Sequence, residues 1–402
     1  MMSKDMKTKI LLLIFLFISM AGVAQKKEIA TAKDYVKKNT SLDKAEQMMR
    51  TLLADSANRT NTKIWNVLFD AQRRQYENGN EKLYLKQKYD TAAIFNITSR
   101  MFRDREAYDS LFNLPHPKES DAKEWRKSHG QLLNMIRPNL LNGGRFFIRK
   151  QKYDVAYLLL NQYIETANQP LFSAYHYGEK DQHLPEAAYW AVYASYKMGN
   201  RKQTLHHTYL ALKDTTHYNQ MLQLLAQTYQ GEGDTVRYVK TLKEGFDRNH
   251  LDDFFFSHLI DYYSARNDWQ QALTMTNQAL GTDSHNLLFR ITKSIILLNT
   301  GKYQECFALC DTLIHENDSV AEAWLNAGLA LFNQGVALDK NPVLSAKKHG
   351  QVISFYKQAL PYLEKYRQLQ PERKDRWALP LYTIYLNLNR GKEFDEIDKL
   401  LK

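Results

Sequence analysis

Residues 253–286, DFFFSHLIDYYSARNDWQQALTMTNQALGTDSHN, form the repeating unit that decides the fold. Asn267 stands at position 15 of this 34-residue unit. A Gly or Asn recurs at the same position in five consecutive units: Gly199, Gly233, Asn267, Gly301 and Gly335. Gly and Asn enter the left-handed backbone conformation at the lowest cost, and this conformation ends a helix before a tight turn. The spacing therefore predicts a series of helical hairpins with one turn every 34 residues.

Apolar and small side chains recur with the same phase as the turn residues. Positions 4, 7, 8, 11 and 20 of the quoted unit hold Phe256, Leu259, Ile260, Tyr263 and Ala272. Large residues at helical spacing predict two amphipathic helices in each unit, and a small residue at the crossing point lets the two helices approach closely. One unit cannot bury its apolar face alone, so consecutive units are expected to stack.

This pattern resembles that of the tetratricopeptide repeat (TPR) family, with a large apolar residue at position 4, an aromatic residue at 11, Gly at 15 and Ala-Leu at 27 and 28. The match covers residues 185–335. The resemblance implies an exported bacterial-type TPR protein with an all-α fold, a right-handed superhelical solenoid of antiparallel helix pairs. We expect a degenerate, less regular helical region over residues 25–180 and the TPR array over residues 181–402.

The regular spacing fails on both sides of the array. After Gly335 the next Gly in the series is Gly391, 56 residues later, which is one repeat plus 22 and predicts an insertion near residues 336–350. A helix is expected to follow over residues 351–369. Upstream, we expect a turn at Gln151, which lies 48 residues before Gly199.

Further upstream, helical hairpins are predicted around Asn39 and around Asn78-Gly79-Asn80. Their periodicity is too irregular to count repeats.

Residues 1–24 have the composition of a signal peptide. Three Lys precede an apolar run over residues 10–20, and small residues at 22–24 precede Gln25. The run is shorter than the roughly 20 residues that a membrane-spanning helix needs, which favours cleavage over an uncleaved anchor. We expect a cut after Ala24, export to the periplasm or cell envelope, and no transmembrane span after the signal peptide.

The net charge of +11 is uneven along the chain. Residues 25–180 hold 27 basic and 18 acidic side chains, a difference of +9, whereas residues 181–402 hold 25 of each. The basic side chains are dispersed among acidic ones, which favours a solvated helical surface. We do not expect a nucleic-acid partner, and binding to an anionic surface remains an alternative for the basic region.

The sequence offers little catalytic chemistry. Cys306 and Cys310 are four residues apart on one predicted helix, a spacing unsuited to a disulfide, so we expect two free buried thiols. Phosphate loops, paired-His zinc helices and nucleophile elbows are absent from the sequence. His206 and His207 are adjacent and are expected on different sides of a helix. We therefore expect no metal, no cofactor and no enzymatic activity.

In TPR solenoids the first helix of each pair lines the concave face, with positions 2, 5, 9, 12 and 13 pointing inward. By this resemblance the ligand groove is expected to hold Tyr189, Tyr193, Tyr196, Gln220, Gln223, Gln227, Gln230, Asp261, Ile291, Ile295, Leu325 and Leu329. Tyr and Gln side chains suit an extended peptide or a sugar chain, and the apolar end suits an amphipathic helix. The Lys and Asn that clamp a C-terminal carboxylate in some family members are missing at positions 5 and 9.

These features predict a non-enzymatic protein–protein interaction scaffold of the cell envelope, with a partner protein or peptide in the concave groove. The alternative function is a glycan- or solute-binding accessory protein at the cell surface. For the tyrosines, internal packing is the competing interpretation, because Tyr at helical spacing is common in cores.

Overall fold

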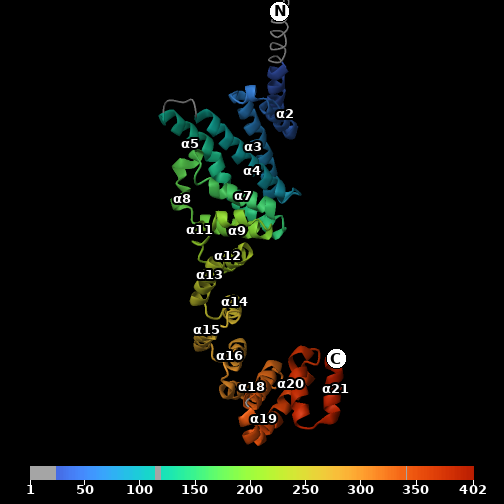
Figure 1. The fold of residues 1–402 in the computed structure, drawn as a ribbon. Helices are drawn as coiled ribbons and strands as arrows, with labels where there is room; N and C mark the ends of the chain where they lie inside the picture. The colour runs from blue at the N-terminus through green and yellow to red at the C-terminus, as the bar shows by residue number, and fades with distance from the viewer. Residues whose placement is uncertain (1–23, 114–118, 341) are drawn as a thin grey trace, which may run out of the picture. The chain divides into compact units, whose positions relative to one another are not determined.

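The computed structural model describes residues 24–113, 119–340 and 342–402. The predicted signal peptide therefore lies outside the described residues except for Ala24. The described residues form helices and turns with no strand, which confirms the all-α prediction (Figure 1). By its internal contacts the chain divides into two units, unit 1 up to Thr228 and unit 2 from Tyr229 to Lys402. Within the described part of the chain, no helix has the length and apolar character needed to cross a membrane.

Unit 1 begins with a helix over residues 24–38 and continues through the first part of α12. Its further helices are α2 (Leu42–Ala54), η1 (Ser56–Asn58), α3 (Thr62–Tyr84), α4 (Thr91–Asn113), α5 (Glu119–Ile136), α6 (Pro138–Arg149), α7 (Tyr153–Glu165), η2 (Pro170–Tyr175), α8 (Tyr177–Lys180), α9 (Leu184–Lys197), α10 (Arg201–His206), α11 (Thr208–Ala211) and α12 (Tyr218–Glu232).

Unit 2 consists of consecutive helix pairs (Figure 1). After the end of α12 these are α13 (Thr235–Arg248), α14 (Asp253–Ser264), α15 (Trp269–Thr282), α16 (Leu287–Asn299), α17 (Tyr303–Glu316), α18 (Ala321–Asp339), α19 (Pro342–Leu369), α20 (Lys374–Asn387) and α21 (Gly391–Leu401). Neighbouring helices in the chain pack on one another, so unit 2 is a helical-hairpin repeat.

Four of the five predicted turn residues have left-handed backbone angles. The φ values are 70° at Gly199, 74° at Gly233, 55° at Asn267 and 75° at Gly301. The residue that follows three of these turns caps the next helix: the side chains of Asn200, Asp234 and Asp268 each accept a hydrogen bond from the backbone N–H three residues on. The 34-residue period thus places a helix stop and a helix start side by side.

Gly335, the fifth predicted turn residue, does not form a turn. It lies inside α18 and is buried. A Cβ atom at this position would lie 2.7 Å from Cε1 of Tyr356 on α19. The prediction was wrong here because the same residue type serves close helix packing, which also requires a missing side chain.

The predicted insertion near residues 336–350 lengthens two helices. α18 runs on to Asp339, and α19 already begins at Pro342, so the helix expected from residue 351 begins nine residues earlier. α19 is kinked at Lys348, where the backbone leaves the helical region. The side chains of residues 341–347 lie outside the described part.

The turn after α20 is also displaced from its predicted place. Asn389, with φ 52°, forms this turn, and Gly391 is the first residue of α21.

In unit 1 the turns predicted at Asn39 and Gln151 are confirmed, with φ values of 53° and 57°. The hairpin predicted around Gly79 forms between α3 and α4, but the predicted place of its turn is wrong. α3 continues through this residue to Tyr84, and the left-handed residue is Lys86. Gly79 is instead buried where Tyr89 packs on α3.

Separate apolar cores hold the helices together. In unit 1, the helix over residues 24–38 packs with α2, α3 and α4 around Met49, Ile64 and Leu68. In unit 2 one core joins α16, α17 and α18, and another joins α18, α19 and α20 around Tyr356, Leu363 and Trp377. Cys306 and Cys310 are free and buried in the former, as predicted.

Candidate functional site

Unit 2 contains an apolar pocket between α18, α19 and α20, which we call the α18–α20 pocket. Its volume is about 390 Å³. It is lined by Phe332, Val336, Asp339, Lys340, Tyr356, Leu379, Pro380 and Thr383. The lining is mainly apolar, with one acidic and one basic side chain at the end of α18.

Helix geometry explains the floor of this pocket. Phe332 and Val336 are one helical turn apart on α18 and share a face. The buried ring of Tyr356 lies against Phe332, with the ring centroids 5.7 Å apart. Gly335 permits this approach, because any larger residue would meet the Tyr356 ring.

A largely apolar stripe on α20 begins at the pocket lining with Leu379 and Thr383 and continues to Leu386, one turn beyond. Leu379 is 65% exposed and Leu386 is 55% exposed. Together with Thr383 they occupy positions i, i+4 and i+7 on one face of α20, which we call the α20 stripe. The opposite face of α20 is buried in the core through Trp377, Leu381 and Ile384. This stripe is therefore not required for the packing of its own helix.

Charged groups lie beside the apolar lining, with Asp339 and Lys340 at the end of α18. Arg376, one turn before Leu379 and Pro380 on α20, pairs with Glu322 on α18 across 2.6 Å. Burial raises the pKa of the Tyr356 phenol above its usual value of 10, and the charge of Asp339 adds to this effect. The hydroxyl is thus neutral at physiological pH. The pocket has the chemistry of an apolar binding site with charged edges.

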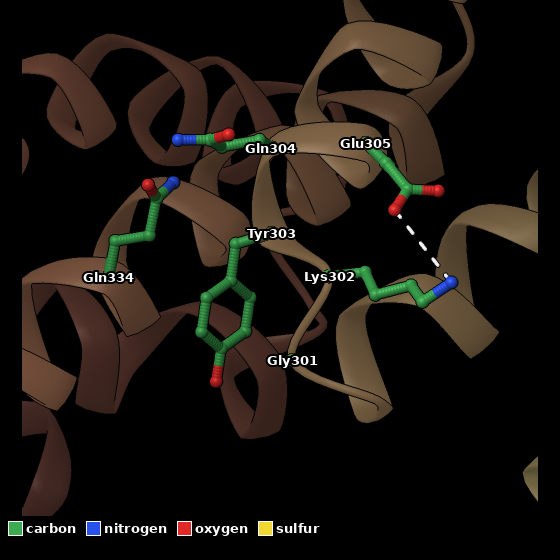
Figure 2. Close-up of a pocket in the computed structure, with 6 residues that line it drawn as sticks. All are labelled: Gly301, Lys302, Tyr303, Gln304, Glu305 and Gln334. Carbon is green, nitrogen blue, oxygen red and sulfur yellow. Dashed lines mark ion pairs between the residues drawn. The ribbon is translucent and has the colours of Figure 1, made fainter.

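A second, polar hollow of about 290 Å³ lies at the turn between α16 and α17 (Figure 2). It is lined by Gly301, Lys302, Tyr303, Gln304, Glu305 and Gln334. Lys302 and Glu305 form an ion pair at 3.8 Å, and Gln334 donates to the Ala330 carbonyl oxygen. Gln334 lies two residues from both Phe332 and Val336, on the opposite face of α18 from the α18–α20 pocket.

Comparison with known proteins gives structural likenesses only. No family model and no curated protein sequence matches the chain. The C-terminal part of a TPR repeat-containing protein from Cytophaga hutchinsonii is 11% identical, with 64% of this chain and 93% of that chain covered at a TM-score of 0.44. Yeast Tom70 is 11% identical over 94% of this chain and 91% of its own, with a TM-score of 0.32. The P58(IPK) TPR domain is 10% identical over 92% and 99%, with a TM-score of 0.29.

The fold is TPR-like. This rests on the helix pairs, the left-handed turns 34 residues apart and the small residues at helix crossings described above. TPR positions can therefore be used to place the predicted groove residues.

The predicted tyrosines of unit 1 are occupied by internal contacts. Tyr189 is only 5% exposed and stacks on His217 with centroids 4.2 Å apart, so its assignment to a ligand groove was wrong. Tyr193 packs edge-on against Tyr153. Tyr196 donates a hydrogen bond to the side-chain oxygen of Gln227 at 2.5 Å, so these two predicted groove residues satisfy each other.

The predicted glutamines of α12 differ in exposure. Gln220 and Gln230 are exposed, whereas Gln223 and Gln227 are half-buried. The two exposed amides stay available to a ligand in the described structure, and their predicted role remains a prediction.

In unit 2 the predicted residues also divide by burial. Leu325 is fully buried in the core with α19 and α20, so its assignment to an open groove was wrong. Asp261 is exposed, and Ile291, Ile295 and Leu329 are half-buried. Leu329 packs against the core beside Phe332, close to the α18–α20 pocket.

The α20 stripe and Tyr356 were not predicted as functional residues from the sequence. The insertion shifted the register after Gly335, so no groove residue was predicted beyond it. One signal was available. Leu379 and Leu386 are seven residues apart on a helix whose opposite face, through Trp377, Leu381 and Ile384, is strongly apolar. Two such faces on one helix indicate one core face and one binding face.

Proposed function

We propose that this chain is a non-enzymatic interaction scaffold that binds an amphipathic helical segment of a partner protein at the α18–α20 pocket. The observation that carries the proposal is the exposed α20 stripe beside an apolar pocket. A helix with Leu-sized side chains at positions i and i+4 or i+7 would place one side chain in the pocket and another against the stripe. Fully burying one such side chain contributes about 1.5–3 kcal/mol.

Two features favour this ligand over an extended sugar or peptide in the Tyr and Gln region. Tyr189 is buried, and Tyr196 and Gln227 are paired with each other. The α18–α20 pocket instead combines an apolar floor with two charged lining residues, Asp339 and Lys340. Charged groups at the edge of an apolar site suit the polar residues that flank the apolar face of a helix.

A photoreactive side chain placed at Leu386 tests whether a partner binds at the α20 stripe beside the α18–α20 pocket. We expect a specific covalent adduct, with the crosslinked peptide mapping to the apolar face of a helix in the partner. The control is the same probe at Leu158 on α7, which is 58% exposed and far from the pocket in sequence. Equal adducts at both positions would contradict the assignment.

The crosslinked segment is then synthesised and titrated against the unaltered chain and Leu379→Ser. We expect the variant to bind at least about tenfold more weakly, which corresponds to about 1.4 kcal/mol. Leu158→Ser is the matched control and should bind like the unaltered chain. A saturable response to polysaccharide fragments, with none to the peptide, would replace this function by glycan binding.

The proposal includes export to the cell envelope, which the composition of residues 1–24 supports. N-terminal sequencing of the protein from its own cells is expected to begin at Gln25. A product that still begins at residue 1 or 2 and stays inside the cell would contradict export.

A further inference from the structure

Three potential metal ligands come together in unit 1. Glu165, His206 and His207 each offer a ligand atom, and these atoms all lie within 4.8 Å of one another. Glu165 is the last residue of α7, and the two histidines end α10 and follow it. We call this group the Glu-His-His cluster. It belongs to neither the α18–α20 pocket nor the polar hollow.

A break in the helix brings the two imidazole rings together. α10 ends at His206, and His207 has φ −107° and ψ 15°, outside the helical range. The ring centroids of His206 and His207 are therefore only 4.2 Å apart. The expectation that adjacent histidines point to different sides was wrong, because it assumed a continuous helix.

A neighbouring side chain orients the buried ring. Nε2 of His207 lies 2.7 Å from the side-chain oxygen of Asn161 on α7. Because an oxygen can only accept, Nε2 carries the hydrogen, and the lone pair of a neutral ring is then on Nδ1. Second contacts of this kind fix the tautomer and the orientation of histidines that bind metals.

The electrostatic surroundings at the end of α7 favour a cation. Glu165 lies at the C-terminus of α7, where the helix dipole is negative. Burial raises the pKa of Glu106 on α4 to about 8, and the charge of Glu165 adds to this effect, so the Glu106 carboxyl is largely protonated at neutral pH. A bound cation would compensate the negative charge of Glu165.

We propose that the Glu-His-His cluster binds one divalent transition-metal ion, with Zn²⁺ the best match to two imidazole nitrogens and one carboxylate. Zinc binds such ligands at about 2.0–2.2 Å, which sets neighbouring ligand atoms about 3.3 Å apart. The ligand atoms, which lie within 4.8 Å of one another, would have to approach by up to about 1.5 Å to reach this spacing. His206 is exposed, so the ion reaches the site from solvent.

The bound ion links the end of α7 to the junction of α10 and α11. These segments are otherwise joined near this point by the hydrogen bond between Asn161 and His207. The ion therefore stabilises the fold of unit 1, as a ligand that binds only the native state must. This inference is independent of the proposed function.

Zinc titration of the full chain, produced without a polyhistidine tag and freed of metal by a chelator, tests the site. We expect one tight equivalent of Zn²⁺ by calorimetry. His206→Ala and Glu165→Gln are expected to weaken it more than the 10- to 100-fold typical of losing an outer partner. His285→Ala removes an exposed histidine elsewhere and should bind zinc like the unaltered chain.

Substitutions of Asn161 test whether its hydrogen bond to His207 supports zinc binding. Asn161→Ala should weaken zinc binding about 10- to 100-fold, and Asn161→Asp, which keeps an oxygen acceptor, should retain it. Circular dichroism verifies that each variant is folded.

Two further measurements locate the ion. The absorption bands of cobalt bound in place of zinc are expected in the unaltered chain and in His285→Ala, and are expected to be lost in His206→Ala. Zinc should also raise the thermal midpoint of the unaltered chain but not that of His206→Ala. The proposal is overturned if the unaltered chain does not bind one equivalent of Zn²⁺ tightly. It is also overturned if His206→Ala and Glu165→Gln bind zinc as tightly as the unaltered chain does.

Discussion

The two units of this chain differ in how many charged side chains they bury. Unit 1 buries the charged side chains of Glu46, Asp104, Arg105, Asp109, Arg137 and Asp214. Of the residues described in unit 2, only Arg290 is a buried Asp, Glu, Lys or Arg. Both units bring helices together over small residues: Gly144 lies against Leu160 in unit 1, and Gly245 lies against Phe255 in unit 2.

Several buried charges of unit 1 take part in hydrogen-bond networks or ring contacts. Glu46 accepts hydrogen bonds from Arg50, Arg100 and Gln75, and Arg50 reaches on to Asp104. Arg137 lies between the rings of Tyr163 and Tyr177, 3.7 and 3.8 Å from their centroids. Each interaction in such a network depends on its own pair of side chains, so the residues that form it need no fixed spacing along the sequence.

This difference explains where the repeat can be read. Small residues at helix crossings recur because every hairpin crosses its neighbour at the same place. Unit 1 also has small residues at close helix contacts, such as Gly143 and Gly144, but networks of charged residues add to its packing, and the 34-residue period fades there. The following predictions test this contrast, from the largest expected effect to the smallest.

Asp181→Asn should cause the largest loss of stability. The Asp181 carboxylate accepts from Arg137 at 2.5 Å and from Tyr163 at 2.7 Å, so the variant leaves the guanidinium of Arg137 buried without its counter-charge. We expect the free energy of unfolding at pH 7 to fall by about 3 kcal/mol, measured by urea denaturation. Asp34→Asn, which removes an exposed i,i+4 pair with Lys38, should cost less than about 0.5 kcal/mol.

The pH dependence of this loss has a definite sign. Burial by itself raises the pKa of Asp181, but hydrogen bonds from Tyr163 and Arg137 outweigh burial and lower the pKa below 3.8. The folded state therefore holds this proton less tightly than the unfolded state. The stabilisation is complete above about pH 4–5 and is lost as the pH falls through the lowered pKa. The gap between the unaltered chain and Asp181→Asn should narrow below pH 4, and a constant gap would contradict this assignment.

Gly335→Ala should have an intermediate effect in unit 2. The added methyl group meets the Tyr356 ring, and overpacking of this kind costs about 1–3 kcal/mol. The matched control is Gly281→Ala in α15, where the added methyl group has open space and should stabilise the helix by up to about 1 kcal/mol. If Gly335→Ala and Gly281→Ala change the free energy of unfolding by the same amount, Gly335 does not act through close packing.

Gly301→Ala should have the smallest effect of the three. Its side chain would meet no atom within 4 Å, but the φ of 75° is unfavourable for any residue with a Cβ atom. We expect a loss of about 1 kcal/mol in the free energy of unfolding. Gly391→Ala, at a position that the period also suggested as a turn but that begins α21, should cost less than Gly301→Ala.

Much of the fold was readable from residue spacing. The turns at Gly199, Gly233, Asn267 and Gly301 follow from local backbone preference, which acts within a few residues and leaves a periodic trace. Gly335 and Gly79 are glycines for another reason. The missing side chain lets Tyr356 pack against Gly335 and Tyr89 pack against Gly79. No local sequence pattern distinguishes a glycine that forms a turn from one that permits close packing.

The binding surface was less readable than the fold. Family positions placed Tyr189 and Leu325 in a groove, but packing from His217 and from α19 covers them. The α18–α20 pocket depends on a lengthened α18 and a kinked α19, for which the repeat has no position. Exposure of a side chain is decided by what the rest of the chain places over it, so it cannot follow from the period alone.

The sequence by itself determined an all-helical chain of hairpins with a 34-residue period, because helix stops, caps and amphipathic faces are local properties of residue order. Only the tertiary structure decided which residues stay exposed and which distant side chains meet. Leu379 remains open beside Tyr356, and Glu165 meets His206 and His207, because these groups belong to different helices whose approach depends on packing.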